Sequence, residues 1–170
     1  MTRNPTKGYA NRVDRDEIMR VLRAFAAAEL EYVLIGATAM AFHGLVRATE
    51  AVDLFIRATA ENVQRLRAAF SSVYEGDPHI NAISAEDLLG SYPAVRYYPP
   101  TGDIYFDVLT RLGEIADFEN VEAEVKEIDD TKVRVATPAA LYRLKKSTVR
   151  LQDRADAAAL RERFHLEDDE

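Results

Sequence analysis

Two aspartates interrupt apolar segments of the sequence, where an unpaired charge is costly. Asp53 stands inside the apolar run 52–56, and Asp107 stands between Phe106 and Val108. Because side chains alternate along a strand, Asp107 is expected on the face opposite its two apolar neighbours. Two such carboxylates on adjacent strands, facing one cleft, would bind a hard divalent cation, Mg²⁺ or else Mn²⁺. The alternative is that both aspartates cap turns or pair with arginines.

A glycine lies where an apolar strand passes directly into a helix. The strand is expected at 32–35 and the helix at 37–42, with Gly36 between them. The first backbone amides of a helix have no intrahelical partner and carry the positive end of its dipole, so a phosphate can bind there. Gly36, Ala37 and Thr38 are therefore candidate phosphate-binding residues. Taken alone, the glycine is better explained by an ordinary tight turn.

Five basic residues lie within twelve positions near the C-terminus of an acidic chain. They are Arg143, Lys145, Lys146, Arg150 and Arg154. On one continuous helix, all of them except Lys145 would fall near one face and could hold a triphosphate or an RNA backbone. The alternative is a solvated helix face. Leu141 and Leu144 are expected to face the core, which makes Lys146 the slightly better phosphate ligand of the two lysines.

The periodicity of the chain predicts an α+β fold, a small mixed sheet with flanking helices. Strands are expected at 32–35, 52–56, 95–98, 104–109, 121–125 and 133–135. Helices are expected at about 17–30, 37–42, 60–70, 138–147 and 153–163. We expect a single domain over 1–170, with a loose lead-in at 1–12 and a frayed acidic tail at 165–170.

The composition is that of a globular protein with a full hydrophobic core. The 170 residues are 48% apolar and 30% charged, and none is cysteine, which excludes a disulfide scaffold, a Cys-ligated metal centre and a thiol nucleophile. No apolar run is long enough to span a membrane and the N-terminus does not look like a signal peptide, so we expect a cytoplasmic protein without a membrane partner. The net charge of −7 argues mildly against a large RNA footprint, unless the basic segment is segregated.

The order of these features resembles a known group of enzymes. A strand ending at Gly36, a short helix, a linker containing Arg47 and a strand bearing Asp53 are followed by Asp107 on a later strand. This pattern resembles the small nucleotidyltransferases of the polymerase-beta-like superfamily, in particular the AbiEii/MenT-type toxin family, over roughly residues 30–164. Asp53 matches the second carboxylate of the family's Asp-x-Asp pair, Asp107 matches its third acid, and the segment 145–150 is similar to its Lys-rich helix.

The resemblance implies a polymerase-beta-like fold and transfer of a nucleoside monophosphate from a nucleoside triphosphate to a hydroxyl group. The acceptor would be an RNA, such as a transfer RNA end, or a protein, in a toxin–antitoxin setting with a cognate antitoxin as partner. Asp53 and Asp107 would hold Mg²⁺, and Asp107 would help to activate the attacking hydroxyl. The turn at 36–38 would cradle the phosphates, although Ala37 replaces the usual second glycine or serine. Lys145 or Lys146, together with Arg150, would balance the triphosphate charge, and Arg47 would meet a phosphate or pair with Glu50.

One position departs from the family pattern. The first carboxylate of Asp-x-Asp should occupy position 51, which is Ala51 here, and strand alternation directs Glu50 to the opposite face. The alanine was either introduced to trap an inactive state, which the intact surroundings favour, or it belongs to a chain that has lost catalysis. Two other functions therefore stay open: a non-catalytic nucleotide-binding or regulatory module, and a plain α+β interaction domain.

Overall fold

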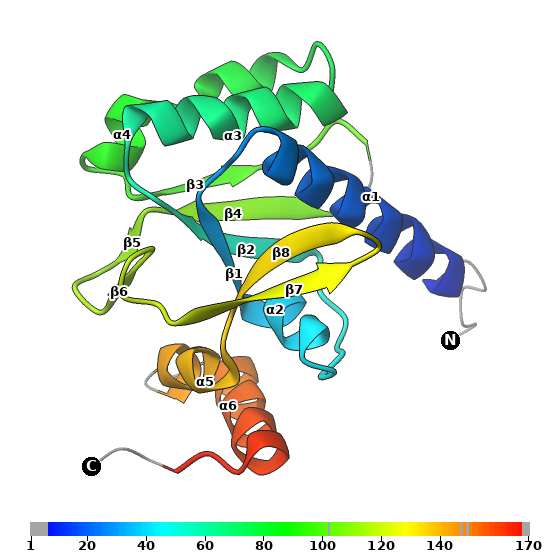
Figure 1. Cartoon of the computed structure of the whole chain (residues 1–170), viewed down its shortest axis with the longest axis vertical. Helices are drawn as coiled ribbons and strands as arrows, with labels where there is room; N and C mark the ends of the chain where they lie inside the picture. The colour runs from blue at the N-terminus through cyan, green and yellow to red at the C-terminus, as the bar shows by residue number, and fades with distance from the viewer. Residues whose placement is uncertain (1–6, 102, 147, 149, 168–170) are drawn as a thin grey trace.

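The computed structural model describes residues 7–101, 103–146, 148 and 150–167, with side chains from residue 15 onward. Its centre is a six-stranded mixed sheet in the order β3-β4-β2-β1-β8-β7 (Figure 1). These strands are β1 (Tyr32–Ile35), β2 (Ala51–Ile56), β3 (Ala94–Tyr97), β4 (Tyr105–Leu109), β7 (Ala123–Ile128) and β8 (Thr131–Ala136). Strand β2 runs parallel to β4 and antiparallel to β1. The α+β fold with a small mixed sheet is therefore confirmed.

Helices cover both faces of this sheet (Figure 1). Helices α1 (Lys7–Ala27) and α3 (Ala60–Val73) pack together on one side. On the other side lie α2 (Gly36–Phe42) and the C-terminal pair α5 (Pro138–Lys146) and α6 (Leu151–Phe164). Four fully buried phenylalanines, Phe25, Phe55, Phe70 and Phe106, come from α1, α3 and the neighbouring strands β2 and β4. Burial of such side chains stabilises the layers by about 2 kcal/mol each.

Several elements differ from the prediction. Helix α1 begins at Lys7, so the loose lead-in expected at 1–12 is helical from that residue on, and 1–6 lie outside the described residues. The tail expected at 165–170 follows α6, and 168–170 lie outside the described residues. Four short elements were not predicted because they have only two to five residues each. They are the 3₁₀ helix Pro78–Ala82, helix α4 (Ala85–Leu89) and the two-stranded sheet of β5 (Arg111–Leu112) and β6 (Ala116–Asp117).

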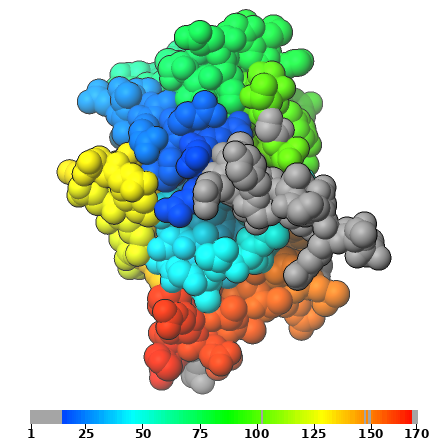
Figure 2. Space-filling model, turned by 90° about the vertical axis from the view of Figure 1, so that its right-hand side faces the viewer, coloured from blue at the N-terminus to red at the C-terminus, as the bar shows by residue number. Residues whose placement is uncertain are grey.

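The prediction that the basic residues form a stripe along one face of a continuous helix is wrong. Helix α5 ends at Lys146 and α6 begins at Leu151, so the predicted cations do not share one helix face. The two helices pack against each other at one end of the molecule, where Figure 2 shows them in orange and red. Among the described residues, no helix combines the length and the apolar character that crossing a membrane requires.

Candidate functional site

The two predicted aspartates lie side by side on neighbouring strands of the sheet. Asp53 on β2 and Asp107 on β4 are register partners of this parallel pair. Each is half-buried and alternates with fully buried neighbours, which confirms that Asp107 lies opposite Phe106 and Val108. Both line one cavity of about 610 Å³, at the boundary between the sheet and the C-terminal helices. The other predicted residues that line it are Gly36, Lys145 and Arg150.

The carboxylate of Asp53 leaves no space for a side chain at Gly36. Its φ of +69° lies in the left-handed region, and Ile35, directly before it, pairs with Asp53 across the antiparallel β1–β2 ladder. A Cβ built at Gly36 would collide with Oδ2 of Asp53. The glycine therefore lets the backbone pass directly over the acidic group. Ala37 and Thr38 are buried and do not line the cavity, so a phosphate would meet their backbone amides rather than the Thr38 hydroxyl.

Replacing Gly36 by alanine is expected to lower the free energy of unfolding by about 2–3 kcal/mol, because a strained φ is combined with a collision. Gly76 provides the matched control, since it has a similar φ of +75° but open space around it. The Gly76→Ala variant should lose only about 1 kcal/mol. Urea unfolding of both variants measures the difference. Equal losses of the free energy of unfolding in the two variants would show that contact with Asp53 is not the reason for a glycine at position 36.

Burial and repulsion act together on Asp53. Burial, followed by the charge of Asp107, raises the pKa of Asp53 from 3.8 to about 6. The hydrogen bond between the two carboxyl groups acts in the same direction, whereas the charges of Lys145 and Arg150 oppose it. Near pH 6 the Asp53 carboxyl group therefore gains or loses its proton, and a cation between the two carboxylates would relieve their repulsion.

This pKa predicts how the stability depends on pH. The folded protein holds the Asp53 proton more tightly than the unfolded chain, so the stabilisation is complete below pH 4 and is lost as the pH rises through 6. Relative to Asp53→Asn, the wild-type free energy of unfolding should fall by about 2–3 kcal/mol over this interval. Urea unfolding at pH 3.5, 5 and 7 measures it. A constant difference between the two proteins would contradict the raised pKa.

Arg96 is part of the site and was not identified from the sequence. It is the register partner of Asp107 on β3, and its guanidinium binds both oxygens of that carboxylate. Nε donates to Oδ1 at 2.8 Å and Nη2 donates to Oδ2 at 3.2 Å. The guanidinium also lies over the ring of Tyr105, 4.6 Å from its centroid. The pairing of Arg96 with Asp107 depends on the hairpin register, which single-residue alternation does not specify.

A buried network positions Lys145 in the cavity wall. Its Nζ lies 2.7 Å from Oδ2 of Asp156 and 3.4 Å from Oδ1 of Asp153, both on α6. Asp156 also accepts two hydrogen bonds of 2.9 Å from the guanidinium of Arg47. Arg47 therefore pairs with Asp156 rather than with Glu50, and it does not line the cavity. The network ties the segment before β2 to both C-terminal helices.

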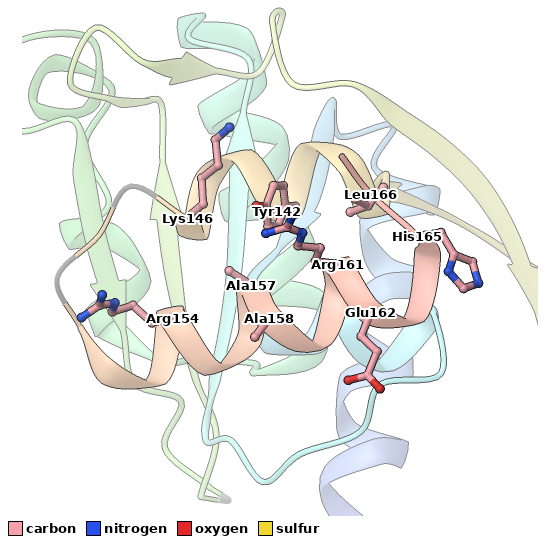
Figure 3. Close-up of a pocket in the computed structure, with 9 residues that line it drawn as sticks. All are labelled: Tyr142, Lys146, Arg154, Ala157, Ala158, Arg161, Glu162, His165 and Leu166. Atoms are coloured by element: carbon pink, nitrogen blue, oxygen red, sulfur yellow. The ribbon is translucent and has the colours of Figure 1, made fainter. Parts of the chain in front are cut away.

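The slight preference for Lys146 over Lys145 does not agree with the geometry. Lys146 is exposed and lines a second groove, of about 830 Å³, between α5 and α6 (Figure 3). Its Nζ lies 5.4 Å from the centroid of the Tyr142 ring. Lys145, in contrast, is only 7% exposed and borders the cavity that holds the two aspartates. Leu141 is buried as expected and Leu144 is half-buried, and both line the same cavity.

Ala51 lies on the same strand face as Asp53, two residues before it. It opens β2, pairs with Tyr105 and is half-buried. Glu50 precedes the strand and is exposed, so it does not replace the missing carboxylate. In the part of the chain that the structure describes, no group of three or more acidic or histidine side chains could hold a metal ion. An aspartate at position 51 would add a third carboxylate to this face.

The sequence comparisons find no match, whereas the structure comparison finds solved structures with a similar fold. No family model and no curated protein matches the chain. Among solved structures, the chain is similar to a Thermotoga maritima protein described as a "putative nucleotidyltransferase", with a TM-score of 0.52 over 94% of both chains. The two sequences are 13% identical, so the likeness concerns the fold. The chain therefore shares the fold of this protein.

Proposed function

We propose that this chain is a nucleotidyltransferase of the AbiEii/MenT type within the polymerase-beta-like superfamily, weakened by Ala51. It would transfer a nucleoside monophosphate from a nucleoside triphosphate to a hydroxyl group and release pyrophosphate. One observation carries the proposal: Asp53, Asp107, Gly36, Lys145 and Arg150 line one cavity. They do so within a fold shared with a nucleotidyltransferase-like protein. Gain of transfer in the Ala51→Asp variant is the test.

The acidic pair fits one divalent cation. Asp53 and Asp107 would hold Mg²⁺ or Mn²⁺, because they are adjacent carboxylates, and burial together with the charge of Asp107 raises the pKa of Asp53. Triphosphate oxygens would supply further ligands. The cation would neutralise charge on the phosphates during the displacement. A second cation would be poorly held, because Ala51 offers no ligand.

The remaining cavity residues would act on the nucleotide directly. Lys145 and Arg150 would balance the charge of the triphosphate, and the amides that follow Gly36 would contact its terminal phosphates. Asp107 would accept the proton of the attacking hydroxyl. Asp156 would position Lys145 through the 2.7 Å contact and would not touch the substrate.

RNA is the acceptor that the charge distribution favours. Residues 143–163 contain seven of the 22 basic residues and three of the 29 acidic ones. Two of those three, Asp153 and Asp156, turn inward toward Lys145, with side chains 16% and 3% exposed. Lys146 and Arg154 line the groove between α5 and α6 (Figure 3), close in the chain to Arg150 of the cavity. A basic end on an acidic molecule would attract a phosphodiester backbone.

Reversing the charge of this groove tests the acceptor. The double variant Lys146→Glu/Arg154→Glu should bind single-stranded RNA about tenfold more weakly, with a shallower salt dependence. The matched control is Arg65→Glu/Arg67→Glu on α3, which changes the net charge equally. Fluorescence anisotropy at two salt concentrations measures both. Equal weakening by the two variants would favour a protein acceptor, and a cognate antitoxin would then be sought as a binding partner.

A non-catalytic nucleotide-binding or regulatory module is the second candidate. Two observations favour it: Ala51 removes one carboxylate, and Arg96 occupies both oxygens of Asp107. Such a module would bind nucleoside triphosphate but would gain no transfer activity from Ala51→Asp. The same variant therefore separates the two functions.

A further inference from the structure

Arg96 binds the Asp107 carboxylate, which a divalent cation would need as a ligand. Its two hydrogen bonds, of 2.8 and 3.2 Å, use both oxygens of the Asp107 carboxylate in a bidentate pair. The guanidinium is also held over the Tyr105 ring, and its Nη1 lies 3.4 Å from the hydroxyl of Tyr98. Tyr105 in turn is the register partner of Ala51. The arginine therefore contacts both Asp107 and Tyr105, the strand neighbour of Ala51.

We propose that the Arg96 guanidinium and a divalent cation compete for Asp107, so that cation loading requires Arg96 to release this carboxylate. The inference deepens the proposed function, since it rests on Asp107 as a ligand of the cation. A guanidinium and a divalent cation that approach the same two oxygens repel each other, so both do not bind at short range. With alanine at position 51, no third carboxylate helps the cation in this competition.

Arg96 is placed so that it can leave. Its side chain is 51% exposed, and β3 is an edge strand of the sheet. Water therefore stabilises the released guanidinium, and the pair itself contributes little net stability at such exposure. Tyr98 and Tyr105 have ring centroids 5.2 Å apart and can retain the guanidinium beside the cavity. There it would face the negative charge of a bound triphosphate.

Cation binding to the full chain without nucleotide tests this competition. Mn²⁺ affinity, measured by electron paramagnetic resonance, should be about tenfold higher in Arg96→Gln than in wild type. Arg96→Lys should fall between the two, because lysine keeps the charge but cannot make the bidentate pair. The control Arg65→Gln also removes an arginine paired with a carboxylate, Glu61, and should bind like wild type. Asp107→Asn should bind Mn²⁺ more weakly than wild type.

A second measurement observes the arginine itself. The ¹⁵N resonance of the Arg96 Nε–H group, assigned by its loss in Arg96→Lys, should shift when Mg²⁺ is added. Arg96→Gln affinity equal to or below that of wild type would overturn the proposal. So would an Nε resonance that stays unchanged at saturating Mg²⁺, or the absence of Mn²⁺ binding in every variant. Neither measurement involves nucleotide transfer, so failure of the proposed reaction is detected separately.

Discussion

Replacing Ala51 by aspartate is expected to raise nucleotidyl transfer by at least about a hundredfold, since a well-held cation contributes several kcal/mol to such a transition state. Position 51 lies on the strand face of Asp53 and is half-buried at the start of β2. An aspartate there would lie on the same face of the sheet as Asp53 and Asp107. Three carboxylates also outweigh the single charge of Arg96, so the variant should retain the cation more firmly.

The assay measures transfer of labelled nucleoside monophosphate to RNA or protein, with each of the four triphosphates in turn. Ala51→Asn is the matched control, because it has nearly the same shape without the charge and should stay near wild-type activity. Adding Asp53→Asn to the aspartate variant should abolish the gain. If Ala51→Asp transfers no more than Ala51→Asn, the enzymatic proposal is contradicted and the nucleotide-binding module is favoured.

Replacing Asp156 by alanine is expected to lower the free energy of unfolding by about 3 kcal/mol. Its side chain is 3% exposed and joins Lys145 to Arg47. Its loss leaves Lys145, whose side chain is only 9% exposed, without the closest partner of its ammonium group. Removing one partner of a buried ion pair is costly because the other charge stays buried. Asp153, at 3.4 Å from Nζ, compensates in part. Lys145 should also leave its position in the cavity wall, which weakens triphosphate binding.

Two comparisons separate this effect from a general weakening of α6. Glu162→Ala changes an exposed residue of the same helix and should alter the free energy of unfolding by less than about 0.5 kcal/mol. Asp156→Asn keeps one acceptor oxygen and should lie between wild type and Asp156→Ala. Urea unfolding provides all three values. An Asp156→Ala protein as stable as Glu162→Ala would show that the network does not hold the helix pair together.

Much of this fold follows from local patterns in the sequence. The run 32–35 and the segment 52–56 have the length and apolar character of buried strands, and both are strands of the central sheet. The alternation around Asp107 indicates its face, and Thr137-Pro138 marks the start of α5. These patterns depend on neighbouring residues alone, so they predict the local elements correctly without knowledge of the tertiary contacts. They assign Gly36 to the junction of a strand and a helix, and Asp53 and Asp107 to two strands.

The pairings across the site depend on long-range register, which no local pattern specifies. Arg96 meets Asp107 because of the β3–β4 register, and Arg47 meets Asp156 although 109 residues separate them. Both lysines lie on α5, where Lys145 borders the cavity and Lys146 lines the groove between α5 and α6. Adjacent residues of an α-helix point about 100° apart around its axis, so the packing of α5 decides which lysine is buried and which is exposed.

The binding of magnesium and nucleoside triphosphate tests the central claim most directly. Isothermal titration calorimetry of the wild-type chain, with each of the four triphosphates, should show binding that requires Mg²⁺. Asp53→Asn and Lys145→Met should each weaken it about tenfold or more, since both residues line the cavity. Glu162→Ala should leave it unchanged. Absence of binding for all four triphosphates, or binding that neither substitution affects, would contradict the site described.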